Sequence, residues 1–271
     1  MQSCKVAVFP LPRGMKLSLE DGELLPDPEL YRRLIGRLLY LNLTRPDLSY
    51  SVQHLSQFVS SPKVPHLQAA LHIVRYLKGT TNAQLFYPSQ TDLTLVAYCD
   101  ADWGSCHFSC RSLTGHCCLL GCSLVSWKTK KQKTVSKSSA ESEYRAMSYT
   151  ASEVVWLHGL LRDFTMSVPM PIQLCCDNKA ALHIAANPVF HERTKHINID
   201  CHYVREKIQE GFLYTSHVRS SAQLADLFTK ALGESQHHFL SSKLGLLLPR
   251  NSNLRGGCEK EDESSVGVDQ N

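Results

Sequence analysis

Apolar side chains recur with helical spacing over the first third of the chain. A stripe with i, i+3, i+4 and i+7 spacing predicts one amphipathic helix, and its members are Tyr31, Leu34, Ile35, Leu38 and Leu39. Pro46 stands where a first helical position is expected, and apolar residues up to Val59 predict a second helix. A third helix is expected from about Pro65, with Gly79 as its C-terminal cap. After an irregular segment over residues 1–27, residues 28–88 are therefore predicted to be all-helical.

From Asp92 the pattern changes to the alternation of a half-buried strand, with Leu93, Leu95, Ala97 and Cys99 on one face. Two further strands, at about 114–120 and 123–128, are predicted to form a hairpin. The later elements alternate between helix and strand, and we expect them at about 140–164, 172–176, 179–186, 200–210, 212–218 and from 222 onward.

This order, βββαβαβα, predicts an α/β domain over residues 92–248. Its five strands would form one mixed sheet with helices on both faces. After Pro249 the chain is polar and acidic, so residues 249–271 are predicted to be a disordered tail.

Composition narrows the function classes only slightly. The net charge of +4 is mildly basic, which is weak support for binding nucleic acid. The sequence has no apolar run long enough to cross a membrane and no recognisable signal peptide. We therefore expect a cytoplasmic or nuclear protein that has no membrane partner.

The chain has 11 cysteines, an odd number, and most lie in apolar strand-like runs. We interpret them as reduced, buried small side chains. The alternative is a zinc site, for which the candidate ligands are Cys106, His107, Cys110 and His116. This set lacks the paired C-x2-C spacing of common zinc modules.

Four acidic residues stand at the ends of predicted elements. Asp100 ends the first strand, Glu143 lies in the first turns of the long helix, Asp177 follows the fourth strand, and Asp226 begins the last helix. In an α/β sheet such positions converge on one edge. Four adjacent carboxylates repel one another unless cations lie among them, and hard oxygen ligands suit Mg²⁺ or Mn²⁺. Two such ions, about 3.5–4 Å apart, are able to promote phosphodiester cleavage.

Long runs of this chain resemble the ribonuclease H (RNase H) domain of copia-type retrotransposons. They are YCDADW at 98–103, LVSWKTKKQKTVSKSSAESEYRAM at 124–147, CCDNKAALHIAANPVFHERTKHINID at 175–200 and QLADLFTKAL at 223–232. The runs YRRLIGRLLYLNLTRPDLSYSV at 31–52 and HLQAALHIVRYLKGT at 66–80 resemble the end of the reverse transcriptase of the same polyprotein. The resemblance places residues 28–88 in a remnant of the reverse transcriptase thumb or connection.

This resemblance implies a three-layer RNase H-like fold that cuts the RNA strand of RNA–DNA hybrids with two Mg²⁺ or Mn²⁺ ions. The D-E-D-D set of the family falls on Asp100, Glu143, Asp177 and Asp226, which would be both catalytic residues and metal ligands. The implied partners are the hybrid and the rest of the polyprotein. The alternative is a catalytically silent fragment that only binds nucleic acid.

Two rival enzymes fit the sequence less well. An integrase of the same fold carries its acidic residues in the order Asp, Asp, Glu, whereas the glutamate here comes second. A reverse transcriptase polymerase would need a Tyr-x-Asp-Asp run, which this sequence lacks. The chain also departs from the copia family that it resembles over Cys106–Gly115, which is less polar than in copia relatives, and we assign no catalytic histidine.

Neighbouring acidic residues leave two choices to be made. Ser138 followed by Glu141 fits a capping box, so we assign Glu141 to the helix start and Glu143 to the metals. Asp100 directly continues the first strand, so we take it rather than Asp102 as the ligand.

Basic and polar residues close to the acidic set are candidates for contacts with nucleic acid. They are Lys128, Lys130, Lys131, Lys133, Asn178, Arg193 and Lys195. Lysines near a phosphodiester would bind phosphates in a salt-dependent way, although a lysine-rich turn is often only a solvated surface. The residues Arg193 and Lys195 could equally fix the loop before the next helix.

Overall fold

The computed structural model describes residues 4–15, 17–187 and 198–247. Helices form the first part of the chain, as the apolar spacing predicts. They are α1 (Pro28–Leu41), the 3-10 turn η1 (Pro46–Leu48), α2 (Ser49–Ser56) and α3 (Val64–Gly79). Asp27 caps α1 by accepting hydrogen bonds from the backbone N–H groups of Glu29 and Leu30.

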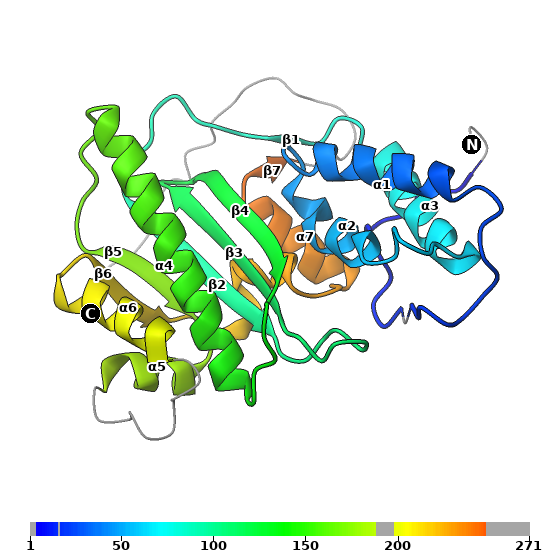
Figure 1. Ribbon diagram of the computed structural model, residues 1–271. Coiled ribbons are helices and arrows are strands. Elements are labelled where there is room, and N and C mark those ends of the chain that lie inside the picture. The colour runs from blue at the N-terminus through cyan, green and yellow to red at the C-terminus, as the bar shows by residue number, and fades with distance from the viewer. Residues whose placement is uncertain (1–3, 16, 188–197, 248–271) are drawn as a thin grey trace, which may run out of the picture.

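The helices enclose a small apolar core of their own. Tyr31, Ile35 and Leu38 of the predicted stripe are buried in it, and the Tyr31 hydroxyl donates to the Leu55 carbonyl oxygen at 2.7 Å. Leu39 is 42% exposed, so the buried stripe is narrower than the sequence predicts. In Figure 1 this helical group lies beside the sheet rather than on one of its faces.

The predicted five-stranded mixed sheet of an RNase H-like fold is confirmed. Its strands are β2 (Leu95–Asp102), β3 (Leu113–Leu120), β4 (Ser123–Lys131), β5 (Ile172–Cys176) and β6 (Leu213–His217). Their order across the sheet is β4-β3-β2-β5-β6 (Figure 1). The β2–β3 and β3–β4 pairs are antiparallel, whereas β2–β5 and β5–β6 are parallel. The central strand β2 therefore joins the hairpin to the parallel half.

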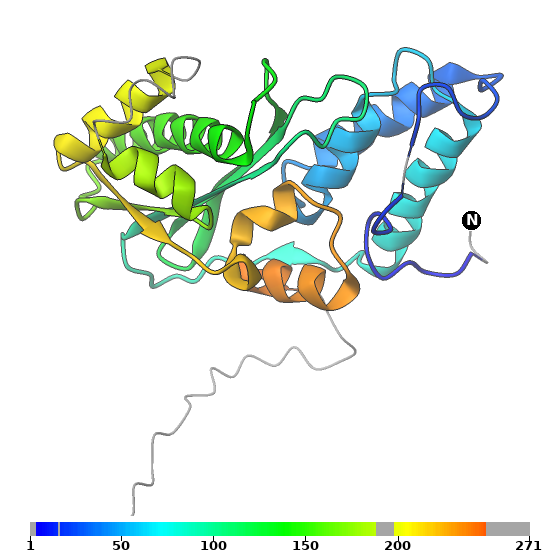
Figure 2. The same cartoon turned by 90° about the horizontal axis from the view of Figure 1, so that it is seen from below.

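Helical elements cover both faces of this sheet. The long helix α4 (Ser139–Asp163) packs with α5 (Lys179–Ala186) and α6 (Asn198–Gln209) over one apolar core. The 3-10 segment η4 (Leu224–Phe228) and helix α7 (Glu234–Lys243) pack with β3 and β4 over a second core. Figure 2 shows α4 and the orange C-terminal segment on opposite sides of the sheet.

Three features differ from the sequence-based expectation. Strands β2 and β4 are longer and reach Asp102 and Lys131. The helix expected from Ala222 is replaced by two 3-10 turns, η3 (Ser220–Ala222) and η4, followed by α7. A two-stranded antiparallel sheet, β1 (Gln84–Leu85) with β7 (Leu246–Leu247), was not predicted.

The replacement of the last helix has a local cause. The buried Gln223 side chain donates to the Cys99 carbonyl oxygen at 2.9 Å, and its own Oε1 accepts from Ala225 N–H. Thr229 and Lys230, at the other end of η4, both contact Asp100. Tethering at both ends to β2 holds the segment in tight turns, and the next helix begins only after Gly233.

Side chains also join the helical group to the sheet. Trp127 on β4 donates from Nε1 to the Asn42 carbonyl oxygen at 3.2 Å. Lys131 on the same strand donates to Gln57, which follows α2. None of the described cysteines forms a disulfide. Among the described helices, none is both long and apolar enough to span a membrane.

Candidate active site

Asp100 and Asp226 form one half of an acidic cluster at the sheet edge. Asp100 lies in β2, two residues before its end, and Asp226 lies in η4. The Lys230 ammonium lies between them, 3.2 Å from Asp100 Oδ1 and 2.7 Å from Asp226 Oδ1. Both carboxylates are buried.

Glu143, Asp177 and Cys176 form the other half. Glu143 comes from the first turns of α4, Cys176 ends β5, and Asp177 follows it directly. One ligand atom from each of these three residues lies within 4.8 Å of the others. Electrostatic repulsion by Asp100 acts on both Glu143 and Asp226, so the two halves adjoin. The structure thus brings the four predicted carboxylates together, and their catalytic role stays a prediction.

The start of α4 separates the two neighbouring glutamates by function. Ser138 caps the helix by accepting from Glu141 N–H at 3.2 Å. The Glu141 carboxylate turns back to accept from Lys137 N–H at 2.8 Å and pairs with Arg145. The interpretation of Glu141 as a cap is confirmed, with the detail that it binds the residue before Ser138. This arrangement leaves Glu143 to face the acidic cluster.

Neutral donors fix the orientation of the carboxylates. The Thr229 hydroxyl donates to Asp100 Oδ2, and the Ser220 hydroxyl donates to Asp177 Oδ2 at 2.7 Å. Each of these bonds holds a carboxylate in place while another oxygen or lone pair remains for a cation.

Burial and mutual repulsion favour the neutral forms of these acids in the absence of metal. Burial, with repulsion from Asp100, raises the pKa of Glu143 to about 10. The same two causes raise the pKa of Asp226 to about 7. Burial also raises the pKa of Asp100, against the attraction of Lys230. For Lys230, burial alone would lower the pKa, but attraction to Asp100 and Asp226 outweighs it and raises the pKa.

This donor set fits a hard divalent cation. Carboxylate oxygens gathered in a partly buried site are the ligands that Mg²⁺ and Mn²⁺ prefer. The Lys230 ammonium acts as a stand-in cation, because it lies between two of the carboxylates. Cys176 adds a softer donor, whose thiol is 3.8 Å from Glu143 Oε2.

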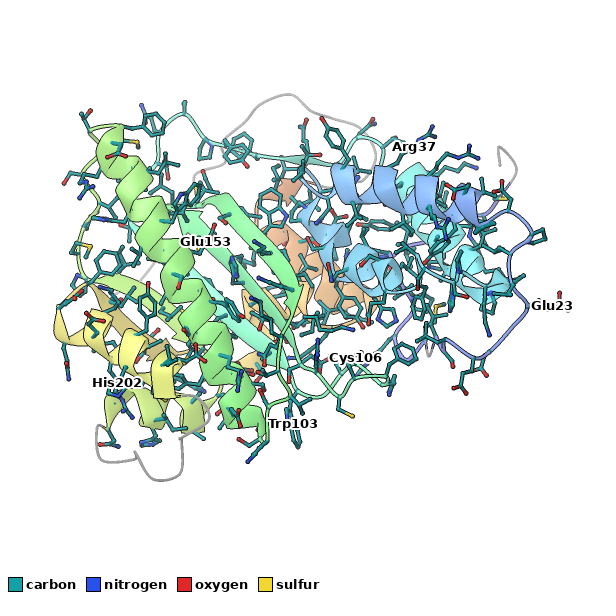
Figure 3. All side chains as sticks on the ribbon, in the orientation of Figure 1. Glu23, Arg37, Trp103, Cys106, Glu153 and His202 are labelled. Carbon is teal, nitrogen blue, oxygen red and sulfur yellow. The ribbon has the colours of Figure 1, made fainter. Side chains whose placement is uncertain are left out.

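The structure also places the candidate zinc ligands and Asp102, the alternative to Asp100. Within the described part of the chain, only Glu143, Cys176 and Asp177 form a group of three with metal-ligand proximity. The zinc alternative based on Cys106, with His107, Cys110 and His116, is therefore wrong. Asp102 is the last residue of β2 and is half-buried. In Figure 3 Trp103 and Cys106 lie at the end of the sheet where this strand stops.

The candidate contacts to nucleic acid fall into distinct environments. Lys128 and Lys130 are exposed on β4 rather than in a turn, and the Lys130 ammonium lies 5.3 Å from the Tyr149 ring centroid. Lys133 is exposed beyond the strand. Lys131 points to the helical group instead, where its ammonium contacts Gln57 and lies 2.9 Å from Cys106 Sγ.

Of the remaining candidates for contacts with nucleic acid, the structure describes Asn178 but not Arg193 and Lys195. The Asn178 side chain caps α5 through Oδ1, which accepts from Ala181 N–H at 3.0 Å. This leaves its NH2 group as the donor for a substrate contact. Arg193 and Lys195 lie outside the described residues.

Sequence reasoning missed Gln223, Thr229, Ser220 and Lys230. One signal was present for Lys230, since Asp226 and Lys230 have the i, i+4 spacing of a helical ion pair. Gln223 contacts Cys99 of β2, and Ser220 contacts Asp177, which follows β5. Both partners are more than forty positions away in the sequence, so no local pattern predicts these contacts.

Comparisons with known proteins identify similar chains. No family model matches this one. The Retrovirus-related Pol polyprotein from transposon RE1 of Arabidopsis thaliana is 43% identical over 246 residues, which cover 91% of this chain and 17% of that protein. The Retrovirus-related Pol polyprotein from transposon TNT 1-94 of Nicotiana tabacum is 30% identical over 255 residues, which cover 91% of this chain and 19% of that protein. This chain thus spans less than a fifth of the length of these relatives.

A solved structure of LC11-RNase H1 in complex with RNA/DNA hybrid has a TM-score of 0.39 and 11% sequence identity. The similarity covers 50% of this chain and 94% of that one. The element order and strand order described above, rather than this likeness, define the fold.

Proposed function

Because the chain belongs to the Pol polyproteins of copia-type retrotransposons, we propose that it is a ribonuclease H that cuts the RNA strand of RNA–DNA hybrids during reverse transcription. The observation that carries this proposal is the meeting of Asp100, Glu143, Asp177 and Asp226 at one sheet edge. Charged carboxylates gathered in such a partly buried cluster repel one another, and bound cations would offset this repulsion.

The four carboxylates would hold two Mg²⁺ or Mn²⁺ ions. Bound there, the ions supply an activated water and stabilise the oxygen that leaves phosphorus. The protein contributes orientation: Thr229 fixes Asp100, and Ser220 fixes Asp177. These bonds limit the freedom of the carboxylates before a substrate arrives, which lowers the cost of organising the site.

Lysines on the edge strand β4 would bind the phosphates of the substrate. Lys128 and Lys130 are exposed there, and Lys133 is exposed beyond the strand. Such contacts give affinity without base specificity. Discrimination of RNA from DNA requires contacts with 2′-hydroxyl groups, for which the Asn178 NH2 group is our candidate. The rest of the polyprotein is a second proposed partner, and the proposed location is the cytoplasm or the nucleus.

A panel of labelled substrates tests this function. We expect the purified chain with Mg²⁺ to cut the RNA strand of a hybrid, and to leave the DNA strand, duplex DNA and duplex RNA intact. Salt-dependent binding of the hybrid without cleavage in Mg²⁺ or Mn²⁺ would instead support the catalytically silent nucleic-acid-binding fragment. Cleavage of all four substrates would indicate a nonspecific nuclease.

A further inference from the structure

Lys230 neutralises only one half of the acidic cluster. Its ammonium contacts Asp100 Oδ1 and Asp226 Oδ1, at 3.2 Å and 2.7 Å. The Lys230 side chain is 36% exposed, whereas the Asp100 side chain is 1% exposed and the Asp226 side chain 10%. The lysine therefore enters the cluster from the solvent side, and its charged end reaches two buried carboxylates.

The other half has no such partner among the described residues. Neither Glu143 nor Asp177 forms an ion pair with a described lysine, arginine or histidine. Neutral donors contact them instead: the Cys176 thiol lies 3.8 Å from Glu143 Oε2, and the Ser220 hydroxyl donates to Asp177 Oδ2 at 2.7 Å. The cluster is thus divided into a half that already holds a cation and a half that does not.

We propose that Lys230 is a built-in competitor for divalent cations, so that the two ions bind with unequal affinity. This inference rests on the proposed metal site. The first ion binds on the side of Glu143 and Asp177, where no described lysine, arginine or histidine has to be displaced. The second ion needs the oxygens of Asp100 and Asp226 and has to displace the Lys230 ammonium. A cation that takes oxygens from another cation gains less free energy than one that binds open oxygens.

Removing the lysine charge should therefore strengthen the weaker step. For Lys230→Gln we expect the weaker dissociation constant for Mn²⁺ to fall at least about tenfold, which corresponds to about 1.4 kcal/mol. The stronger step should change much less, since Lys230 does not contact Glu143 or Asp177. Lys230→Arg keeps the charge, and it should retain the two unequal steps.

Calorimetric titration of the substrate-free chain with Mn²⁺ tests this directly, and it needs no catalysis. Wild type should show two classes of site with unequal dissociation constants for Mn²⁺. In Lys230→Gln the difference between these two constants should be smaller. Asp226→Asn should lose the weaker class. Lys243→Gln is the matched control, because it removes a lysine charge on α7 whose ammonium lies over the Phe239 ring. It should leave both constants unchanged.

A measurement on wild type alone covers the case in which the Lys230 variants do not fold. In ¹⁵N-lysine NMR, the Lys230 side-chain signal should be slow to exchange without metal. It should shift when the second equivalent of Mg²⁺ binds, rather than with the first.

The outcomes separate this inference from the proposed function. Equal Mn²⁺ binding by wild type and Lys230→Gln would overturn the inference and leave the metal site intact. Weaker binding by Lys230→Gln would also overturn it, because the lysine would then organise the carboxylates for the ions. If wild type binds no Mn²⁺, the metal site fails and the inference fails with it.

Discussion

Asp100 and Gly115 are direct partners across strands β2 and β3, and the glycine lets the η4 segment approach Asp100. A Cβ atom at Gly115 would lie 2.6 Å from Thr229 Cγ2 and 2.8 Å from Phe228 Cβ. Contacts that short do not occur between carbon atoms, so any side chain at Gly115 would push η4 away. The position of Asp226 and Lys230 beside Asp100 therefore depends on a residue that carries no chemistry.

Gly115→Ala should destabilise the protein and weaken metal binding together. We expect a loss of about 1–3 kcal/mol in the free energy of unfolding, the usual cost of overpacking a buried site. Urea denaturation and Mn²⁺ titration would measure the two effects.

Gly159→Ala is the matched control for this substitution. Gly159 lies inside α4 with no atom within 4 Å of an added Cβ, so alanine should stabilise the helix by about 0.5–1 kcal/mol. Unchanged stability and metal binding in Gly115→Ala would contradict the placement of η4.

The buried Glu143 should make the metal-free protein less stable as the pH rises. Its pKa is raised from 4.5 to about 10 in the folded state. Below pH 4.5 the carboxyl is protonated in both the folded and the unfolded state, so its contribution to the free energy of unfolding is fully present. Above pH 4.5 the Glu143 carboxyl loses its proton in the unfolded chain but keeps it in the folded one. Its contribution to the free energy of unfolding is therefore lost progressively up to about pH 10. In EDTA the free energy of unfolding should therefore fall across this window, and added Mg²⁺ should reduce the loss.

Replacing Glu143 with Gln should remove much of this pH dependence. At pH 8 in EDTA we expect Glu143→Gln to be more stable than wild type, by on the order of 1–3 kcal/mol. Glu141→Gln should instead cost about 1 kcal/mol or less at the same pH, because it weakens a helix cap. Thermal unfolding at several pH values would distinguish them. The reverse result would mean that Glu141, not Glu143, faces the cluster.

The sequence allowed prediction of those features that follow from local periodicity. Strand alternation located β2, β3 and β5, and the ends of predicted elements located Asp100, Glu143 and Asp177. Asp226 was expected at a helix start but lies in the 3-10 segment η4. The capping pattern at Ser138 separated Glu141 from Glu143. These features were predictable because each depends on residues within about four positions of one another.

Features that depend on distant partners were not predictable in the same way. The region after Ala222 has helical propensity, but the tethers of Gln223 and Thr229 to β2 replace a helix with tight turns. The sequence predicts a polar turn at Lys128 and Lys130, because the end of this edge strand lacks the alternation of apolar and polar residues that is typical of a strand. Lys131 faces Gln57, and that contact depends on how the helical group packs against the sheet.

The two environments of the lysines give a prediction for binding of the hybrid. Lys130→Gln should reduce the slope of log affinity against log salt by about 0.9, the value for one lost phosphate contact. Lys131→Gln should leave the slope nearly unchanged, because its ammonium is held by Gln57 and Cys106. Fluorescence anisotropy with a labelled hybrid in Ca²⁺, over a series of salt concentrations, would measure both slopes. Equal slopes for the two variants would contradict the assignment.

Hydrolysis of the hybrid by wild type and Asp177→Asn tests the central claim most directly. The substitution removes a carboxylate from the cluster but keeps its size, and it leaves the lysines of β4 in place. Wild type should cut the RNA strand in Mg²⁺ or Mn²⁺ but not in Ca²⁺, whose longer ligand distances position water poorly. Asp177→Asn should bind the hybrid with nearly wild-type affinity and cut it more slowly by several orders of magnitude, a loss expected when a metal ligand of the reaction is removed. Cleavage by Asp177→Asn at the wild-type rate, or by wild type in EDTA, would contradict the claim that these carboxylates form the catalytic metal site.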